Sequence, residues 1–212
     1  KIMWSIHSTT LDPGPEKKGT ELAISLSSFL SKVVPDKIIL CSKASHHFHE
    51  TIGFEKNKMM VIPNGIDLVK FKYSSNAKLN LISKLKLGHE TKFIGMVARY
   101  HAMKRHDIFL HAAQIVISKY PSIHFVLCGS GIDNSNQKLV ELINLFELSS
   151  NIHLLGYMSD MSDLYSSLDV LSITSSYGES FPLTICEAMA CKLPVVTTDV
   201  GAASYIINNK EF

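Results

Sequence analysis

The chain alternates between short apolar runs and amphipathic helical stretches along its whole length. The apolar runs are rich in Ile, Val and Leu without polar alternation, which is typical of parallel strands covered on both faces. The expected strands are residues 2–6, 37–41, 59–62, 92–97, 123–128, 152–156, 169–173 and 194–197. The expected helices are about residues 20–32, 43–51, 76–87, 105–119, 136–148, 161–167, 183–191 and 202–207. This alternation predicts an α/β fold with doubly wound parallel sheets.

A polar stretch divides the chain into two predicted domains. Residues 63–65 read Pro-Asn-Gly, a turn signal, and residues 70–92 are rich in Lys, Ser and Asn. We therefore expect residues 1–75 to be the tail of one α/β domain, residues 76–91 a linker, and residues 92–212 most of a second α/β domain.

The two ends of the sequence suggest a piece of a longer protein. The chain opens directly in an apolar run and stops just after another apolar stretch. The lack of a targeting segment therefore carries little meaning.

Composition and charge exclude several classes of protein. Of the 212 residues, 46% are hydrophobic and the formal net charge is +2. These values exclude a disordered chain and argue against nucleic acid as the main partner. No apolar run approaches the roughly 18 residues of a membrane-spanning helix. Residues 1–92 carry 14 Lys and 8 acidic residues, so this part could bind an anionic membrane surface or an anionic acceptor. The alternative is a lysine-rich surface that is simply solvated.

The cysteines and histidines do not form a predicted metal site. The sequence has no Cys-x-x-Cys pair, and no histidine is spaced with a cysteine as a zinc ligand. We expect free thiols in a reducing, cytoplasmic compartment. The four cysteines are Cys41, Cys128, Cys186 and Cys191.

The segment that leads from the strand at 169–173 into the following helix predicts an anion site. Pro182 suits the first helical position, where its missing N–H would have no partner in any case. The free N–H groups around Phe181 to Thr184 would then point out of the helix start, which favours a diphosphate. Glu179 precedes this helix and Glu187 lies within it, so two carboxylates are available to accept hydrogen bonds from separate hydroxyls of one extended ligand.

Two further strand ends carry candidate ligand groups. Arg99 comes two residues after the strand at 92–97, and Lys104 comes shortly after it. Cations at the carboxyl ends of parallel strands lie where open α/β sheets bind ligands, so they suit a phosphate. Gly129 and Gly131 form a Gly-x-Gly turn after the strand at 123–128, which permits close backbone approach; without a third glycine it does not identify a dinucleotide.

Taken together, these motifs resemble the family 4 retaining glycosyltransferases, which have the two-Rossmann glycosyltransferase-B (GT-B) fold. The resemblance covers nearly the whole chain and rests on motifs in a fixed order. They are Val61 to Asp67, Val97-Ala98-Arg99 with Lys104, Cys128 to Gly131, Leu154 to Tyr157, and the pair Glu179 and Glu187 in a Glu-x7-Glu spacing. The resemblance implies that the N-terminal part is the acceptor side and the C-terminal part binds a nucleotide sugar.

The resemblance also implies a role for each candidate residue. Glu179 would contact the hydroxyls of the donor sugar, and His7 would reach that sugar from the N-terminal domain. These two are the catalytic candidates. The expected donor-binding residues are Arg99, Lys104, Gly129, Gly131, Gly156, Tyr157, Ser180, Phe181, Pro182, Leu183, Thr184 and Glu187. Among these, Arg99 and Lys104 would hold the diphosphate, Glu187 the ribose, and Gly156 and Tyr157 would lie near the base.

The implied reaction is transfer of a sugar from a nucleotide diphosphate sugar, a UDP-sugar by family resemblance, to an acceptor hydroxyl with retention of configuration. No Asp-x-Asp motif is present, so we expect neither a metal nor a cofactor. The expected acceptor is a glycan or a lipid-linked glycan of polysaccharide, lipopolysaccharide or glycolipid synthesis, at the cytoplasmic face of a membrane.

Two departures from the family pattern stand out. Ala98 replaces the glycine of a Gly-Arg pair, and the usual Gly-Gly-x-x-Glu reads Gly201-Ala202-Ala203-Ser204-Tyr205. The alternatives are a non-catalytic nucleotide-sugar-binding or protein-interaction module on a degenerate GT-B fold, an epimerase or phosphorylase of the same fold, and an NAD-dependent dehydrogenase.

Overall fold

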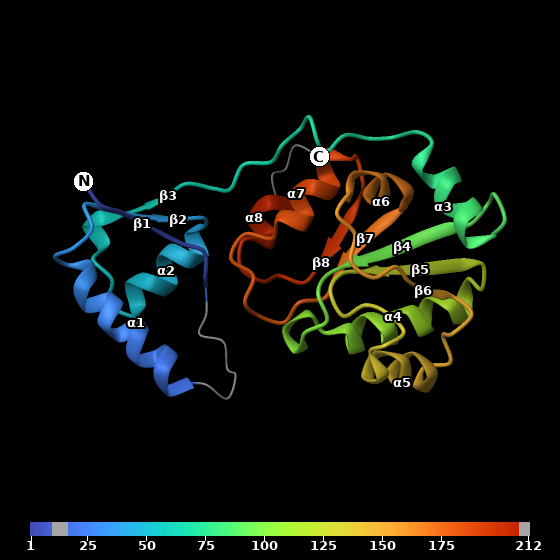
Figure 1. Cartoon of the computed structure of the whole chain (residues 1–212), viewed down its shortest axis with the longest axis horizontal. Helices are drawn as coiled ribbons and strands as arrows, with labels where there is room; N and C mark the ends of the chain where they lie inside the picture. The colour runs from blue at the N-terminus through green and yellow to red at the C-terminus, as the bar shows by residue number, and fades with distance from the viewer. Residues whose placement is uncertain (10–16, 208–212) are drawn as a thin grey trace. The chain divides into compact units, whose positions relative to one another are not determined.

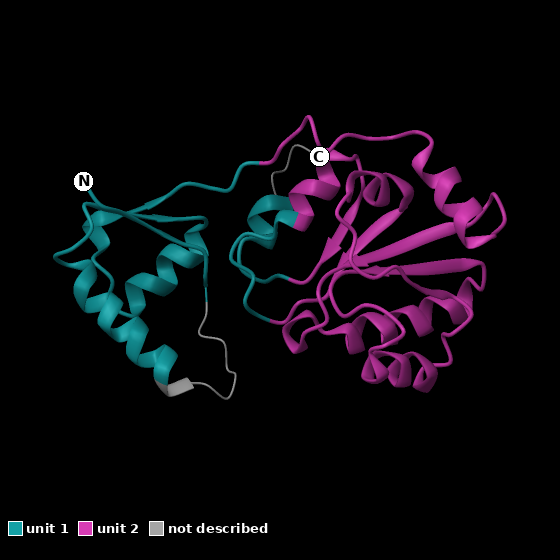
Figure 2. Cartoon of the chain, in the orientation of Figure 1, with its two compact units in different colours: residues 1–65, 177–183, 199–212 teal, residues 66–176, 184–198 magenta. Residues whose placement is uncertain are grey.

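The computed structural model describes residues 1–9 and 17–207 and divides into two compact units (Figure 2). Unit 1 comprises residues 1–65, 177–183 and 199–212, and unit 2 comprises residues 66–176 and 184–198. This grouping differs from the predicted boundaries, because the stretch expected to be a linker, residues 76–91, lies inside unit 2.

Unit 1 contains a parallel sheet of three strands in the order β1-β2-β3 (Figure 1). The strands are β1 (Met3–Ile6), β2 (Lys37–Leu40) and β3 (Met59–Val61). Helix α1 (Lys17–Ser31) joins the first two strands, and α2 (Lys43–Thr51) with the short 3₁₀ turn η1 (Lys56–Lys58) joins the last two. A small core formed by Ile38, Leu40, Phe54 and Met59 holds this sheet to its helices.

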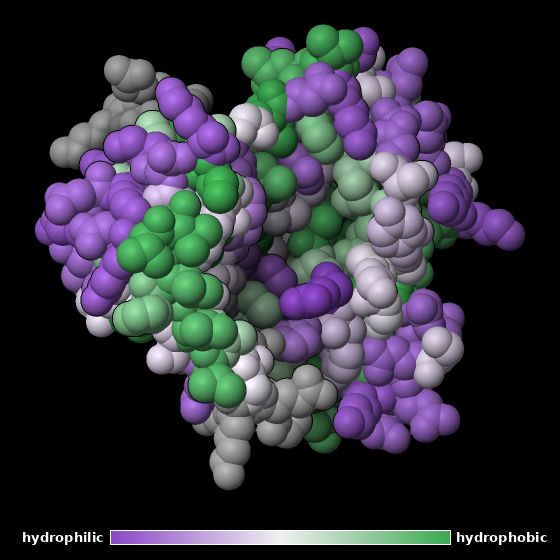
Figure 3. Space-filling view, turned by 60° about the vertical axis from the view of Figure 1, so that its left-hand side comes forward, coloured by the Kyte–Doolittle hydropathy of each residue, from purple (hydrophilic) through white to green (hydrophobic). Residues whose placement is uncertain are grey.

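One face of α1 is apolar but exposed. Leu22, Leu26 and Phe29 are spaced by four and three residues, so they share one side of the helix, and Val33 follows just after the helix ends. Their exposed fractions are 71%, 56%, 66% and 72%. Figure 3 shows apolar side chains gathered in a band on this unit. The periodicity of α1 therefore marks an apolar surface that the described residues of unit 1 leave exposed.

Unit 2 is built on a parallel sheet of five strands in the order β6-β5-β4-β7-β8 (Figure 1). The strands are β4 (Lys92–Val97), β5 (Ile123–Cys128), β6 (Ile152–Leu154), β7 (Val170–Ile173) and β8 (Val195–Thr197). The helices are α3 (Ala77–Leu85), α4 (His106–Lys119), α5 (Gln137–Leu145), α6 (Ser162–Ser167) and α7 (Leu183–Ala190), and α7 begins at the last residue of a unit 1 segment. A 3₁₀ turn η2 (Ala102–Lys104) precedes α4, and α8 (Ala203–Ile207) belongs to unit 1.

The sheet of unit 2 has a topological switch between its central strands. The chain runs from β4 outward through β5 to β6, and then returns to pair β7 with the other edge of β4. The core beneath β4 and β5 includes Phe109, Phe125 and Leu127, each at most 2% exposed. This arrangement opens the carboxyl ends of β4 and β7 to a ligand, because open α/β sheets bind ligands at such a switch point.

The α/β class with parallel sheets is confirmed, and every predicted strand and helix has a counterpart in the structure. The differences are local. Helix α1 begins at Lys17 rather than near residue 20, and the two 3₁₀ turns were not predicted. Such turns are too short to leave a periodic apolar pattern. Among the described residues, no helix is long and apolar enough to cross a membrane.

Candidate functional site

Both predicted phosphate-binding cations of unit 2 follow β4, the central strand of its sheet. Arg99 comes two residues after the strand ends and is exposed, and Lys104 closes η2 and is half-buried. The backbone here is fixed by the neighbouring strand end, since the Ala98 N–H donates to the Cys128 carbonyl at 2.9 Å and the Tyr100 N–H to the Ser130 carbonyl at 2.8 Å. Both cations therefore belong to a loop that is anchored at the switch point.

The loop that follows β4 is hydrogen-bonded to the loop that follows β7. The Thr174 hydroxyl donates to the Lys104 carbonyl at 2.9 Å and to the Arg105 carbonyl at 3.1 Å. The Ser176 N–H donates to the Met103 carbonyl at 2.9 Å. These bonds tie the segment that carries the two cations to the segment that runs toward α7.

The predicted glycine turn packs directly against the end of β4. Gly129 has φ of +150°, and a Cβ atom there would lie 2.1 Å from the Ala98 carbonyl oxygen. No larger residue fits without moving the backbone. The Gly129 N–H donates to the Gly156 carbonyl at 2.9 Å, which links the ends of β5 and β6. Gly131 and Gly156 also have positive φ, of +73° and +68°, and Tyr157 beside them is 78% exposed.

Glu187 of α7 has a fixed partner that sequence reasoning did not single out. The hydroxyl of Tyr165 in α6 donates to Glu187 Oε2 at 2.6 Å. Tyr165 is fully buried, whereas Glu187 is half-buried. The two residues are 22 positions apart in different helices, so no local pattern joins them. In the sequence, a tyrosine within a predicted helix of the apolar core indicates only that its ring packs in the core.

The remaining predicted site residues belong to unit 1. His7 directly follows β1, is exposed, and lies with its Nε2 3.0 Å from the Ser5 hydroxyl. The Ser180 hydroxyl is buried 2.8 Å from the Cys41 sulfur, next to the end of β2. Glu179 and Phe181 are half-buried, Pro182 is buried and Leu183 is exposed at the start of α7.

The backbone of the segment that carries Glu179 is in close contact with a glycine. Gly201 has φ of +64°, and a Cβ atom there would lie 1.5 Å from the Glu179 carbonyl oxygen. Any side chain at position 201 would therefore displace the Glu179 backbone. Gly201 is the first residue of the segment that departs from the Gly-Gly-x-x-Glu pattern of the family. Here it allows close packing against the Glu179 backbone.

The structure thus divides the predicted site residues between the two units. Unit 2 holds Arg99, Lys104, Gly129, Gly131, Gly156, Tyr157, Thr184 and Glu187. Unit 1 holds His7, Glu179, Ser180, Phe181, Pro182 and Leu183. Within unit 2, the loops after β4, β5, β6 and β7 meet at one edge of the sheet, as the hydrogen bonds above show.

A buried histidine at the start of α4 lies next to the cationic loop. His106 is 3% exposed, and among the described residues neither ring nitrogen has a hydrogen-bond partner. Its ring lies 5.1 Å from that of Tyr100. Burial, and next the charge of Lys104, lower the pKa of His106 from 6.5 to about 4. The ring is therefore neutral at physiological pH.

The described residues contain no group of three or more His, Cys, Asp or Glu arranged to hold a metal ion. The four cysteines are free thiols, three of them buried and Cys186 half-buried. Burial raises the pKa of Cys128 and of Cys186, which makes both thiols poor nucleophiles.

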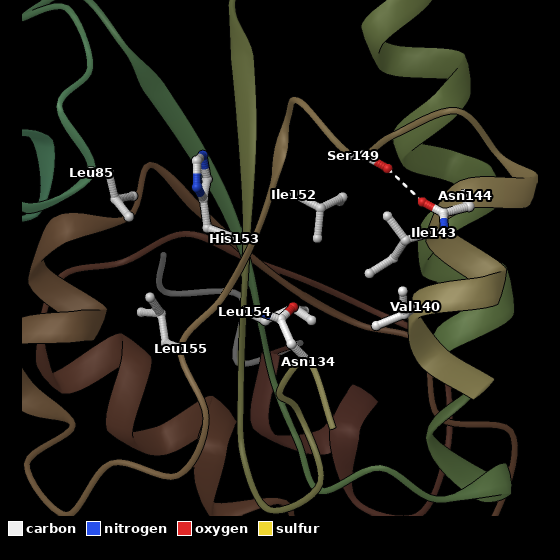
Figure 4. A pocket seen from close by; sticks show the side chains of 10 residues that line it. All are labelled: Leu85, Asn134, Val140, Ile143, Asn144, Ser149, Ile152, His153, Leu154 and Leu155. Carbon is white, nitrogen blue, oxygen red and sulfur yellow. Dashed lines mark hydrogen bonds between the residues drawn. The ribbon is translucent and has the colours of Figure 1, made fainter. Parts of the chain in front are cut away.

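A pocket of about 410 Å³ lies elsewhere on unit 2, between the edge strand β6 and α5 (Figure 4). Its wall includes Ile152 and His153 from β6 and Val140 and Asn144 from α5 (Figure 4). None of the predicted site residues lines it. Because open α/β sheets bind ligands at the carboxyl edge rather than beside an edge strand, we place the candidate site at the switch point.

Comparison with known proteins identifies several relatives. A family model described as "Glycosyl transferases group 1" matches residues 78–211. The chain is 28% identical over 211 residues to the N,N'-diacetylbacillosaminyl-diphospho-undecaprenol alpha-1,3-N-acetylgalactosaminyltransferase of Campylobacter jejuni, covering 98% of this chain and 54% of that protein. It is 26% identical over 213 residues to the UDP-Gal:alpha-D-GlcNAc-diphosphoundecaprenol alpha-1,3-galactosyltransferase of Escherichia coli, covering 99% and 54%. The chain therefore spans about half the length of these curated relatives.

Solved structures show the same fold. The crystal structure of Anabaena HepE in complex with UDP and glucose superposes with a TM-score of 0.83 at 24% sequence identity, covering 98% of this chain and 55% of that one. A sucrose-phosphate synthase from Thermosynechococcus elongatus superposes with a TM-score of 0.80 at 19% identity, covering 97% and 52%.

Proposed function

Because this chain belongs to the glycosyl transferases group 1 family, we propose that it carries the donor-binding site of a family 4 retaining glycosyltransferase. The enzyme moves a sugar from a nucleotide diphosphate sugar to an acceptor hydroxyl. A UDP-sugar is the proposed donor, because the similar Escherichia coli protein is named for UDP-Gal and the similar Anabaena structure contains UDP.

One observation carries this proposal: the loop with Arg99 and Lys104 is hydrogen-bonded to the loop after β7, at the topological switch of the unit 2 sheet. A diphosphate there would receive hydrogen bonds and positive charge from both cations and from the N–H groups at the start of α7. We assign Ser180 to Thr184 to that helix start. The glycines at positions 129 and 131 let the loop after β5 pack closely against Ala98 and Tyr100, next to Arg99.

The proposed chemistry depends on charge stabilisation. Departure of the nucleoside diphosphate leaves an oxocarbenium-like sugar and places growing negative charge on the phosphate oxygens. Arg99, Lys104 and the helix N–H groups stabilise that charge where it develops. The acceptor hydroxyl attacks the face that the diphosphate leaves, which retains the configuration, and its proton passes to the departing phosphate.

The other site residues orient the donor. Glu179 accepts hydrogen bonds from the donor sugar, and His7 contacts the same sugar. Glu187 accepts from the ribose, and Gly156 and Tyr157 lie near the base. The positive φ of Gly156 and the exposure of Tyr157 support a surface that is open to a planar ring.

We propose a lipid-linked glycan as the acceptor, in the synthesis of a polysaccharide, lipopolysaccharide or glycolipid. Two of the similar proteins are named for undecaprenol diphosphate-linked acceptors. The excess of lysine in residues 1–92 supports peripheral contact with the anionic inner face of a membrane.

The proposal is tested by measuring the melting temperature with UDP, GDP and ADP. A nucleotide present at a hundred times its Kd should stabilise the fold by about 2.7 kcal/mol, which raises Tm by about 5 °C or more. Arg99→Ala and Glu187→Ala should reduce this rise, whereas Lys119→Ala, at the far end of α4, should not.

Absence of any rise in the wild-type chain would refute a donor site. A second outcome would favour the non-catalytic nucleotide-sugar-binding module. In that outcome UDP raises Tm, but the chain transfers no sugar from UDP-sugars to lipid-linked acceptors, even after the rest of the family fold is supplied in trans.

A further inference from the structure

The hydrogen bond between Tyr165 and Glu187 joins a core residue to a residue of the proposed donor site. Its length, 2.6 Å, is that of a strong hydrogen bond from a hydroxyl to a carboxylate. Tyr165 belongs to α6 and is fully buried, and its ring packs near that of Phe71 at a centroid distance of 6.2 Å. The hydroxyl of Tyr165, which donates this hydrogen bond, therefore has a fixed position within unit 2.

Packing alone does not explain a hydroxyl at this position. A phenylalanine would fill the same space without a polar group, and a buried phenol without a partner would destabilise the core. Among the described residues, the Tyr165 hydroxyl donates its hydrogen bond to Glu187. The hydrogen bond to the Glu187 carboxylate thus explains why a hydroxyl is present at this buried position.

This contact leaves Glu187 able to bind a ligand. An ionised carboxylate has about four acceptor positions, and Tyr165 occupies one of them on Oε2. Among the described residues, no other hydrogen bond reaches this carboxylate, so Oε1 and the remaining position of Oε2 can accept from hydroxyls. Burial, and next the hydrogen bond to Glu187, raise the pKa of Tyr165 far above its ordinary value, so the phenol remains a donor.

We propose that Tyr165 is a positioning residue that holds the Glu187 carboxylate in the orientation in which it accepts hydrogen bonds from the vicinal ribose hydroxyls of the donor nucleotide. This inference rests on the proposed function. It assigns to the α6–α7 contact the task of preorganising an acceptor pair, so that the side chain of Glu187 loses little freedom when the nucleotide binds.

The test compares UDP with 2′,3′-dideoxy-UDP on the full chain, by isothermal titration. Tyr165→Phe removes the hydroxyl and keeps the ring. We expect it to weaken UDP binding about 5- to 20-fold, and to leave binding of the dideoxy nucleotide within about twofold. In a Glu187→Ala background, Tyr165→Phe should have no further effect on UDP, because the residue acts through that carboxylate.

The control Tyr120→Phe makes the same chemical change at a tyrosine that is 61% exposed at the end of α4, and it should change neither affinity. An equal loss for both nucleotides, or a loss that persists without the Glu187 carboxylate, would show that Tyr165 has a merely structural role. Unchanged UDP binding by Tyr165→Phe would overturn the inference while the proposed function stands. Failure of the wild-type chain to bind UDP would overturn both.

Discussion

His106 illustrates how one side chain makes the stability of this protein depend on pH. Both ring nitrogens are buried, and the described residues offer them no hydrogen bond. Protonation must therefore bring an unpaired charge into the core beside Lys104. The pKa of about 4 in the folded chain lies below the value of 6.5 expected after unfolding, so the unfolded state binds the proton more tightly.

We predict that stability falls as the pH drops from about 6.5 to about 4. The neutral ring is favoured in the folded state, so its contribution is complete above pH 6.5 and is lost as the pH falls through the folded pKa. The full loss is about 3 kcal/mol. Urea unfolding at pH 7.5, 6.0, 5.0 and 4.5 would measure it, with His106→Phe expected to show a shallower decline.

His111 of the same helix is exposed and stacks on Phe146, which makes His111→Phe a matched control. That variant should keep the pH dependence of the wild type. Identical slopes for His106→Phe and the wild type would contradict the prediction.

Single residues were also where sequence reasoning was least complete. Arg99, Lys104 and the glycines were predicted because each lies at or shortly after the end of a predicted strand, and that position can be read from the local sequence. Tyr165 was not, because its importance depends on a hydrogen bond to another helix. The proposed roles of Glu179 and Glu187 rest on their spacing within the family motif and remain predictions.

Helix α3 is held to the sheet of unit 2 by a charged contact. Lys78 Nζ lies 2.7 Å from both carboxylate oxygens of Asp169, which comes directly before β7. The Phe93 N–H donates to the same carboxylate at 2.8 Å. Although burial favours the neutral acid, hydrogen bonds from Lys78 and Phe93 hold the pKa of Asp169 below its ordinary value. One carboxylate thus joins α3, β4 and β7.

We predict that Asp169→Asn destabilises unit 2 by about 2 to 4 kcal/mol, because it leaves Lys78 without its half-buried partner. Chemical denaturation gives the size of the loss, and hydrogen exchange should show faster exchange of the α3 amides. Asp163→Asn, on the exposed face of α6, should cost less than about 0.5 kcal/mol. Equal losses in the two variants would mean that the contact is not needed to anchor α3.

The helices and strands could be predicted from the sequence because the apolar runs of the strands and the amphipathic pattern of the helices are both strong. Continuous apolar runs gave every strand of the parallel sheets, and amphipathic stretches gave the helices between them. Residues 76–87 were also expected to be helical, and α3 lies within them. What the pattern did not reveal was that this helix packs against α6 and joins unit 2, since that depends on contacts more than 70 residues apart in sequence.

For the molecule as a whole, the exposed apolar band on α1 bears on association in solution. Contiguous apolar surface of this kind promotes association. We predict that the triple variant Leu22→Gln, Leu26→Gln and Phe29→Gln binds less of an apolar fluorescent dye and associates less in sedimentation velocity. Its unit 2 should still respond to UDP as in the wild type, because these residues lie in unit 1.

A control for this variant replaces apolar side chains that are equally exposed but scattered. Ile115→Gln with Leu145→Gln changes residues that are 51% and 73% exposed on separate helices of unit 2. It should leave dye binding and association nearly unchanged. If the control has the same effect as the triple variant, the continuity of the α1 band does not matter.

The domain boundaries were the least accessible property of the whole molecule. The predicted linker was placed by polar composition, whereas the compact units are defined by contacts that bring residues 177–183 and 199–212 into one group with residues 1–65. Composition changes gradually along a chain, but such grouping depends on distant segments and leaves no signal in a local window.

The close approach of Gly201 to the Glu179 carbonyl has a practical consequence for engineering. Under the proposed function, in which Glu179 contacts the donor sugar, a change of sugar specificity would be sought by exchanging the segment at 177–183 between homologues. A crossover between that segment and residue 201 takes the Glu179 backbone from one parent and residue 201 from the other. If the second parent has any side chain at position 201, that side chain displaces the grafted loop. Chimeras should therefore inherit both segments from the same parent.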